Sequence, residues 1–127
     1  MILRSAMLAA AALTATACER RPQAVAVEDA WLRLPPVPGR PAAAYFTVTG
    51  PDGVRVTGAS SPAAARIELH HSRIEGGVMR MGPLDPAGAT LRSGRLEFAP
   101  GGRHGMVFGL DRSVTAGGSI PLTVTFE

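Results

Sequence analysis

The sequence predicts a single all-β domain, built as a sandwich or a small barrel from many short strands. Runs of β-branched or alternating apolar residues recur at short intervals, and Gly or Pro separates each run from the next. The 127-residue chain contains 15 Gly and 11 Pro, a composition that discourages long helices. Its length fits one domain, and we find no internal repeat.

Eight segments have the strand pattern. They are Val25–Leu34, Ala43–Thr49, Val54–Ala59, Arg66–Ser72, Val78–Met81, Arg95–Phe98, Gly105–Leu110 and Ile120–Phe126. Seven turn-forming stretches separate them: Pro35–Gly39, Gly50–Gly53, Ser61-Pro62, Glu75–Gly77, Gly82–Gly88, Pro100–Gly102 and Ala116–Gly118. A single helical turn over residues 62–65 is the only helix expected.

The fourth and fifth strands are expected to form a hairpin. Glu75-Gly76-Gly77 separates them, and glycine pairs are common in tight hairpin turns. The extended fourth strand, residues 66–74, would then pair with Val78–Met81. This pairing would bring Met81 back toward His70.

The first 24 residues are expected to lie outside this domain. Residues 1–17 place Arg4 before a short apolar run that ends in Ala15-Thr16-Ala17, the pattern of a secretory signal peptide. Cys18, the only cysteine, follows directly and resembles the lipidated cysteine of bacterial lipoproteins. Ordinary cleavage before an unmodified Cys18 is the alternative. Residues 18–24 would form a tether, residues 25–127 the domain, and the product would be exported to the periplasm.

Charge and composition disfavour several functional classes. The chain has 13 basic and 10 acidic residues, and its basic residues, all Arg, are scattered rather than clustered. Few aromatic residues accompany them, so a nucleic-acid surface is not expected. No nucleophile elbow or phosphate-binding loop is present, and we do not expect an enzyme. An electron-transfer blue-copper site would need a cysteine ligand within the domain, where the sequence has none.

Histidine and methionine cluster in one part of the chain. All three His and three of the five Met lie between residues 70 and 106, and the other two Met lie in the expected signal. Imidazole and thioether groups without a nearby thiolate suit Cu(I) better than zinc. The candidate metal ligands are His70, Met81, His104 and Met106.

Strand alternation sorts these candidates by face. His104 and Met106 share a face of their strand, as do Met79 and Met81. His70 and His71 point to opposite faces of their strand. His70 suits a solvent-accessible ligand better, because the residues that share its face, Glu68 and Ser72, are polar. Ordinary structural roles stay open, since Met106 is in phase with core-like residues and Met packs adaptably into cores.

The spacing of these residues resembles the periplasmic copper chaperones called PCuAC. That family has His, ten residues, Met, about twenty-one residues and then His-x-Met. Here ten residues separate His70 from Met81, and twenty-two precede His104-Gly105-Met106. Shorter stretches that resemble the family lie in the same order from Glu28 to Glu127, among them residues 29–33, 43–49, 77–81, 100–104 and 120–126.

The resemblance implies a cupredoxin-like Greek-key β-sandwich that binds one Cu(I) near its surface through His70, Met81, His104 and Met106. It also implies delivery of copper to the CuA site of cytochrome c oxidase, directly or through a Sco-type copper protein. One departure is His71, where the family usually has Glu. This imidazole could serve Cu(II) or compete with His70, and a structural role is the alternative.

Two other functions remain open from the sequence. A secreted copper-binding protein for scavenging, storage or resistance would have the same site and a different partner. A metal-free interaction module would take up no Cu(I). Competition with a colorimetric Cu(I) chelator separates this last reading from the others.

Overall fold

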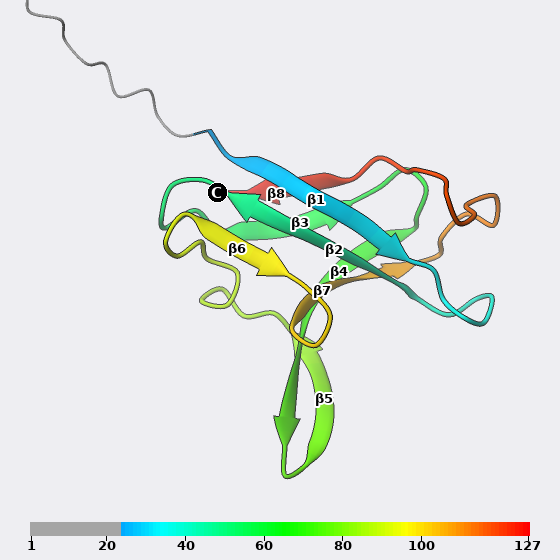
Figure 1. The fold of residues 1–127 in the computed structure, drawn as a ribbon, viewed down its shortest axis with the longest axis horizontal. Helices are drawn as coiled ribbons and strands as arrows, with labels where there is room; N and C mark the ends of the chain where they lie inside the picture. The colour runs from blue at the N-terminus through cyan, green and yellow to red at the C-terminus, as the bar shows by residue number, and fades with distance from the viewer. Residues whose placement is uncertain (1–23) are drawn as a thin grey trace, which may run out of the picture.

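The computed structural model describes residues 24–127, which form eight β-strands and no helix (Figure 1). The strands are β1 (Ala26–Arg33), β2 (Ala42–Thr49), β3 (Val56–Ser60), β4 (Arg66–Glu75), β5 (Val78–Pro83), β6 (Arg95–Phe98), β7 (Arg103–Phe108) and β8 (Thr123–Phe126). All eight predicted strands are present in the predicted order, so the all-β class is confirmed.

Antiparallel pairing joins these strands into one strongly curved sheet with the order β1-β2-β7-β4-β3-β8. Two strands branch from this path, because β5 pairs with β4 and β6 pairs with β2. Several neighbours are far apart in sequence: β7 lies between β2 and β4 and pairs with both. This non-consecutive order brings the His104-Gly105-Met106 segment beside the strand that carries His70.

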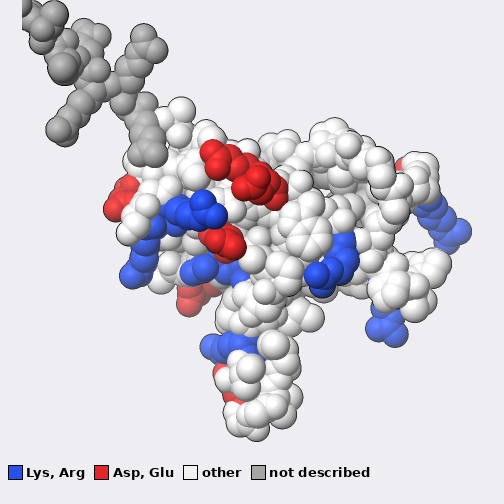
Figure 2. Space-filling model, in the orientation of Figure 1, with Lys and Arg blue, Asp and Glu red and all other residues white. Residues whose placement is uncertain are grey.

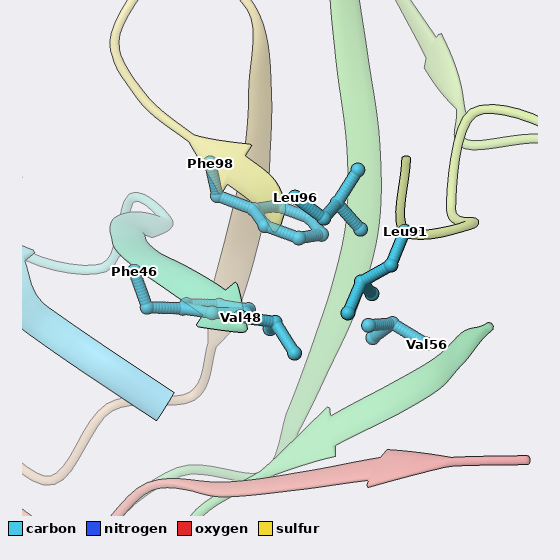
Figure 3. Close-up of a cluster of buried hydrophobic side chains, with 6 residues drawn as sticks. All are labelled: Phe46, Val48, Val56, Leu91, Leu96 and Phe98. Carbon is cyan, nitrogen blue, oxygen red and sulfur yellow. The ribbon is translucent and has the colours of Figure 1, made fainter. Parts of the chain in front are cut away.

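The main core lies where β2 and β6 face β3 across the curved sheet (Figure 3). Its buried members are apolar residues of β2, β3, β6 and the segment before β6: Phe46, Val48, Val56, Leu91, Leu96 and Phe98. The rings of Phe46 and Phe98 stack with centroids 4.4 Å apart. A smaller cluster of Ala42, Ala44 and Val107 extends the core toward β7. β2 is buried over most of its length, Tyr45 and Thr47 included, so both of its faces are covered.

Strand ends differ from the prediction where backbone chemistry overrides the apolar pattern. β8 begins at Thr123 rather than Ile120, because Pro121 has no N–H to donate to a sheet ladder. β7 begins earlier, at Arg103, and therefore includes His104. β3 begins at Val56 because Val54 closes a turn onto the Pro51 carbonyl. Residues 62–65 form a turn without helix.

The β4–β5 hairpin projects from the body of the sandwich (Figure 1). Gly76 and Gly77 form its two-residue turn with φ of 57° and 79°, positive values that glycine adopts without strain. The predicted hairpin is therefore confirmed. Ile74 and Met79 pair on one face of it, while Arg73 and Arg80 pair on the other.

The expected signal peptide, the tether before residue 24 and Cys18 lie outside the described residues. Within residues 24–127, no helix has the length and apolar character needed to cross a membrane.

Candidate metal centre

Two candidate ligands lie directly opposite each other on neighbouring strands. In the antiparallel pairing of β4 with β7, His70 is the partner of His104. The next pair on the same face joins Glu68 to Met106. Because directly paired residues project to one side of a sheet, His70, His104 and Met106 share a face.

Met81 reaches the same face from β5. It pairs with Ser72, two residues beyond His70, and so lies diagonally across from His70. Diagonal neighbours on one face of a sheet are within reach of long side chains. The three adjacent strands β7, β4 and β5 thus present all four candidate residues on one face.

His104 is the buried member of this group, with 5% of its surface exposed. Its Nδ1 lies 3.0 Å from the carbonyl oxygen of Gly102. Since a carbonyl can only accept, Nδ1 donates the proton and Nε2 carries a free lone pair. Nε2 is itself buried and has no hydrogen-bond partner. Buried polar atoms are nearly always satisfied, so an orphaned imidazole nitrogen points to a missing ligand such as a metal ion.

The two imidazoles are close enough to share one ion. Their ring centroids are 6.0 Å apart and the planes meet at 62°. With metal–nitrogen bonds of about 2 Å, each centroid would lie about 3 Å from the metal. The observed separation is within the span of two such rings around a common ion.

Exposure rises across the site from β7 to β5. His104 is buried, the His70 side chain is 21% exposed, and Met81 is 59% exposed. Met106 is partly buried on the outward face, whereas its neighbour Val107 fills the core at 1% exposure. One end of the site is fixed inside the protein, and the other end reaches solvent.

Two aromatic side chains, Trp31 of β1 and Tyr45 of β2, pair near the end of β2 that pairs with β7. The pairing of β2 with β7 ends at Ala44 and Gly105, so Tyr45 directly follows and His104 directly precedes the residues of this last pair. Tyr45 is buried and its ring lies 4.6 Å from that of Trp31, with the Arg33 guanidinium over both rings.

Gly105 lets β7 pack closely enough to hold both of its candidate ligands. A Cβ atom there would lie 3.2 Å from Ile67 Cγ2 and 3.3 Å from Ala44 Cβ. Both distances are tighter than ordinary van der Waals contact. A larger residue would push β7 away from β2 and β4 and would move His104 and Met106 with it.

His71 and Met79 lie outside the group of four candidate ligands, each for a different reason. His71 is paired with Arg103 and Gly82, on the opposite face from His70. Met79 shares the face of Met81 but lies nearer the hairpin tip, opposite Ile74. Neither residue is placed where it can bind beside His104 without a shift of the strand.

The donor set carries little charge. Within the described part of the chain, no three His, Cys, Asp or Glu side chains gather into a metal-binding group. Most of the face shown in Figure 2 is uncharged, and the basic and acidic side chains on it are scattered, with no large patch of one sign. Two imidazoles and two thioethers are neutral, soft ligands, which suit Cu(I) better than a hard dication.

The sequence prediction missed two neighbours of the site, Glu68 and Tyr45. Glu68 Oε2 lies 3.1 Å from His70 Nε2. A hydrogen bond from Arg66 holds the pKa of the Glu68 carboxyl below its ordinary value, with a smaller contribution from His70. Glu68 precedes His70 by two residues and so shares its face, a signal that was available from strand alternation. Tyr45 could not be found this way, because its place depends on the pairing of β2 with β7.

The fold and the sequence both match known proteins. The fold resembles the solved structure titled "Copper-bound PCuAC domain from PmoF2", with a TM-score of 0.57 and 24% identity over 81% of each chain. The predicted cupredoxin-like fold and the resemblance to PCuAC-type proteins are thus confirmed.

The family model described as "Putative lipoprotein LpqE-like" matches residues 25–127. The chain is also 30% identical over 142 residues to "Putative lipoprotein Lxx21020" of Leifsonia xyli subsp. xyli, covering 99% of this chain and 82% of that protein. The protein therefore belongs to the LpqE-like family.

Proposed function

We propose that this protein binds one Cu(I) through His70, Met81, His104 and Met106 and transfers it to another protein. The observation that carries the proposal is the orphaned Nε2 of His104, buried on the face that also presents the other three side chains. The solved relative with the same fold holds copper, which supports the choice of metal.

The ligand set is suited to reversible binding. Neutral imidazole and thioether ligands hold Cu(I) without the negative charge of thiolates, and they avoid the oxidation that thiolates undergo outside the cytosol. Thioethers take up no protons at biological pH, so only the two His ligands compete with protons for the metal.

The gradient of exposure favours transfer over storage. An incoming ligand from a partner must replace one ligand at a time, and Met81, 59% exposed on a projecting hairpin, is the accessible one. His104 at the buried end would hold the ion until the exchange is complete. A storage site would be served better by four enclosed ligands.

The recipient we propose is the CuA site of cytochrome c oxidase, reached directly or through a Sco-type protein. The PCuAC-type resemblance supports this recipient. The lipoprotein names of the family and of its relative support export, with anchoring to the membrane through Cys18. Transfer is tested by incubating the Cu(I)-loaded protein anaerobically with a copper-free CuA domain, with and without a Sco-type protein, then separating the proteins and measuring the copper in each. Oxidation of the separated CuA domain with ferricyanide should then produce the absorption of the mixed-valence dicopper centre. A CuA domain that gains no copper in either mixture refutes this recipient.

Copper binding is tested by competition with a colorimetric Cu(I) chelator under anaerobic conditions. We expect the wild-type protein to take up one equivalent. Met81→Ala should weaken binding far more than the control His71→Ala, which removes an imidazole adjacent to His70 but on the other face. Equal effects of the two substitutions, or no uptake by the wild type, would refute the proposed site.

A further inference from the structure

Three side chains of alternate residues form a chain of polar contacts along the outward face of β4. Arg66 Nε donates to Glu68 Oε1 over 3.0 Å, and Glu68 Oε2 lies 3.1 Å from His70 Nε2. Both oxygens of one carboxylate are thus engaged, one by a guanidinium and the other by a candidate ligand.

The outer end of this chain is itself held in place. Arg66 pairs with Phe108 of β7, and its guanidinium carbon lies 4.1 Å from the centroid of the Phe108 ring. Stacking on an aromatic face restricts the planar guanidinium, which in turn restricts the carboxylate it binds. Glu68 is therefore presented to His70 from a fixed position rather than as a free surface side chain.

This contact determines which nitrogen of His70 can bind a metal. A glutamate carboxyl is ordinarily ionised at neutral pH, and Glu68 accepts a hydrogen bond from the Arg66 guanidinium, which favours the ionised form. An ionised carboxylate only accepts hydrogen bonds, so His70 Nε2 must donate the proton. In the neutral imidazole the remaining nitrogen, Nδ1, then carries the free lone pair.

We propose that Glu68 is a positioning residue that fixes the tautomer of His70 and makes Nδ1, rather than Nε2, its copper-binding atom. The inference rests on the proposed copper site. Under this proposal the two imidazoles bind through different nitrogens, because the Gly102 carbonyl accepts from Nδ1 of His104 and leaves Nε2 of that ring free. The metal would be bound by Nδ1 of one ring and Nε2 of the other. Carboxylates that hold ligating imidazoles in this way commonly strengthen metal binding.

The first test uses the copper-free protein. Long-range proton–nitrogen correlation spectra of 15N-labelled protein at neutral pH distinguish the protonated from the unprotonated ring nitrogen. We expect His70 to be protonated at Nε2 in the wild type and to populate both tautomers in Glu68→Gln. A wild-type His70 protonated at Nδ1, or a tautomer unchanged by Glu68→Gln, would overturn the proposal.

The second test adds one equivalent of Cu(I), which is diamagnetic and leaves the spectra readable. We expect the 15N chemical shifts of His70 Nδ1 and His104 Nε2 to move on addition of Cu(I) to values typical of metal-bound nitrogens. Binding through Nε2 of His70 would show that Glu68 competes with copper, and would overturn the proposal. No Cu(I) uptake would refute the proposed function and this ligand assignment together, while the copper-free spectra still show whether Glu68 fixes the ring.

Affinity provides a third readout with a matched control. Glu68→Gln should raise the Kd for Cu(I) by about 10- to 100-fold, the usual effect of losing such a carboxylate. Glu97→Gln is the control, because Glu97 also accepts from an arginine two residues earlier, Arg95, and has no histidine partner. It should change the Kd less than about twofold. An unchanged or tighter Kd in Glu68→Gln would contradict the positioning role.

Discussion

Replacing His104 with leucine separates the metal site from the stability of the fold. In the metal-free protein His104 Nε2 is buried without a partner. An unsatisfied buried polar group costs about 1–3 kcal/mol, and an apolar side chain of similar size removes that cost. Replacing a typical buried residue has the opposite effect, because it lowers the stability of the protein.

The free energy lost with the hydrogen bond at the other ring nitrogen, His104 Nδ1, is smaller than this gain or similar to it. Leucine at position 104 removes the hydrogen bond from Nδ1 to the Gly102 carbonyl, worth about 1 kcal/mol. That carbonyl still accepts from the Ser72 N–H at 3.0 Å, so it is not left unpaired. The two terms leave metal-free His104→Leu as stable as the wild type or more stable by about 2 kcal/mol.

The assay is urea unfolding of the metal-free proteins, with Cu(I) competition on the same samples. Phe98→Ala serves as the reference for an ordinary core residue and should cost about 3–5 kcal/mol without changing the copper ligands. His104→Leu should keep its stability and lose Cu(I) binding. A loss of more than about 2 kcal/mol in His104→Leu would refute the reasoning, because it would show that the imidazole is satisfied in the metal-free fold.

Three further outcomes are expected. Gly109→Ala should destabilise the fold by at least about 1–2 kcal/mol in urea unfolding, because Gly109 has a φ of 63° and a Cβ there would lie 2.6 Å from Ala65 Cβ; unchanged stability would show that this turn is free to relax. Cu(I) affinity should fall as the pH is lowered from 7 to 5, because protons compete for the imidazole ligands, and an affinity that stays flat over this range would argue against His ligation. The Ser113 N–H lowers the pKa of Asp111, so the stability that Asp111 contributes is present above about pH 4 and is lost as the pH falls further. Unfolding of Asp111→Asn across pH 2–6 should therefore show a weaker acid dependence than the wild type, and identical profiles would contradict this contribution.

The strands could be predicted from the sequence because Gly and Pro separate nearly every apolar run. The Gly76-Gly77 turn also fixed the pairing of β4 with β5, since a two-residue turn leaves little freedom of register. The ends were predicted less well: Pro121, which cannot donate to a ladder, delayed the start of β8.

The composition of the candidate site was also predictable, but its geometry was not. Alternation placed His104 with Met106 and separated His70 from His71. Nothing in the local pattern shows that β4 pairs with β7, and only that pairing sets His70 opposite His104. The burial of His104 and its unpaired Nε2 follow from the same long-range contact, as does the place of Tyr45.

The ligand set of bound copper tests the central claim most directly. X-ray absorption at the copper edge of protein loaded with one equivalent of Cu(I) resolves nitrogen and sulfur neighbours. We predict two nitrogen and two sulfur ligands, with one sulfur lost in Met81→Ala and one in Met106→Ala. A copper environment without sulfur, or one unchanged by both substitutions, would contradict the account.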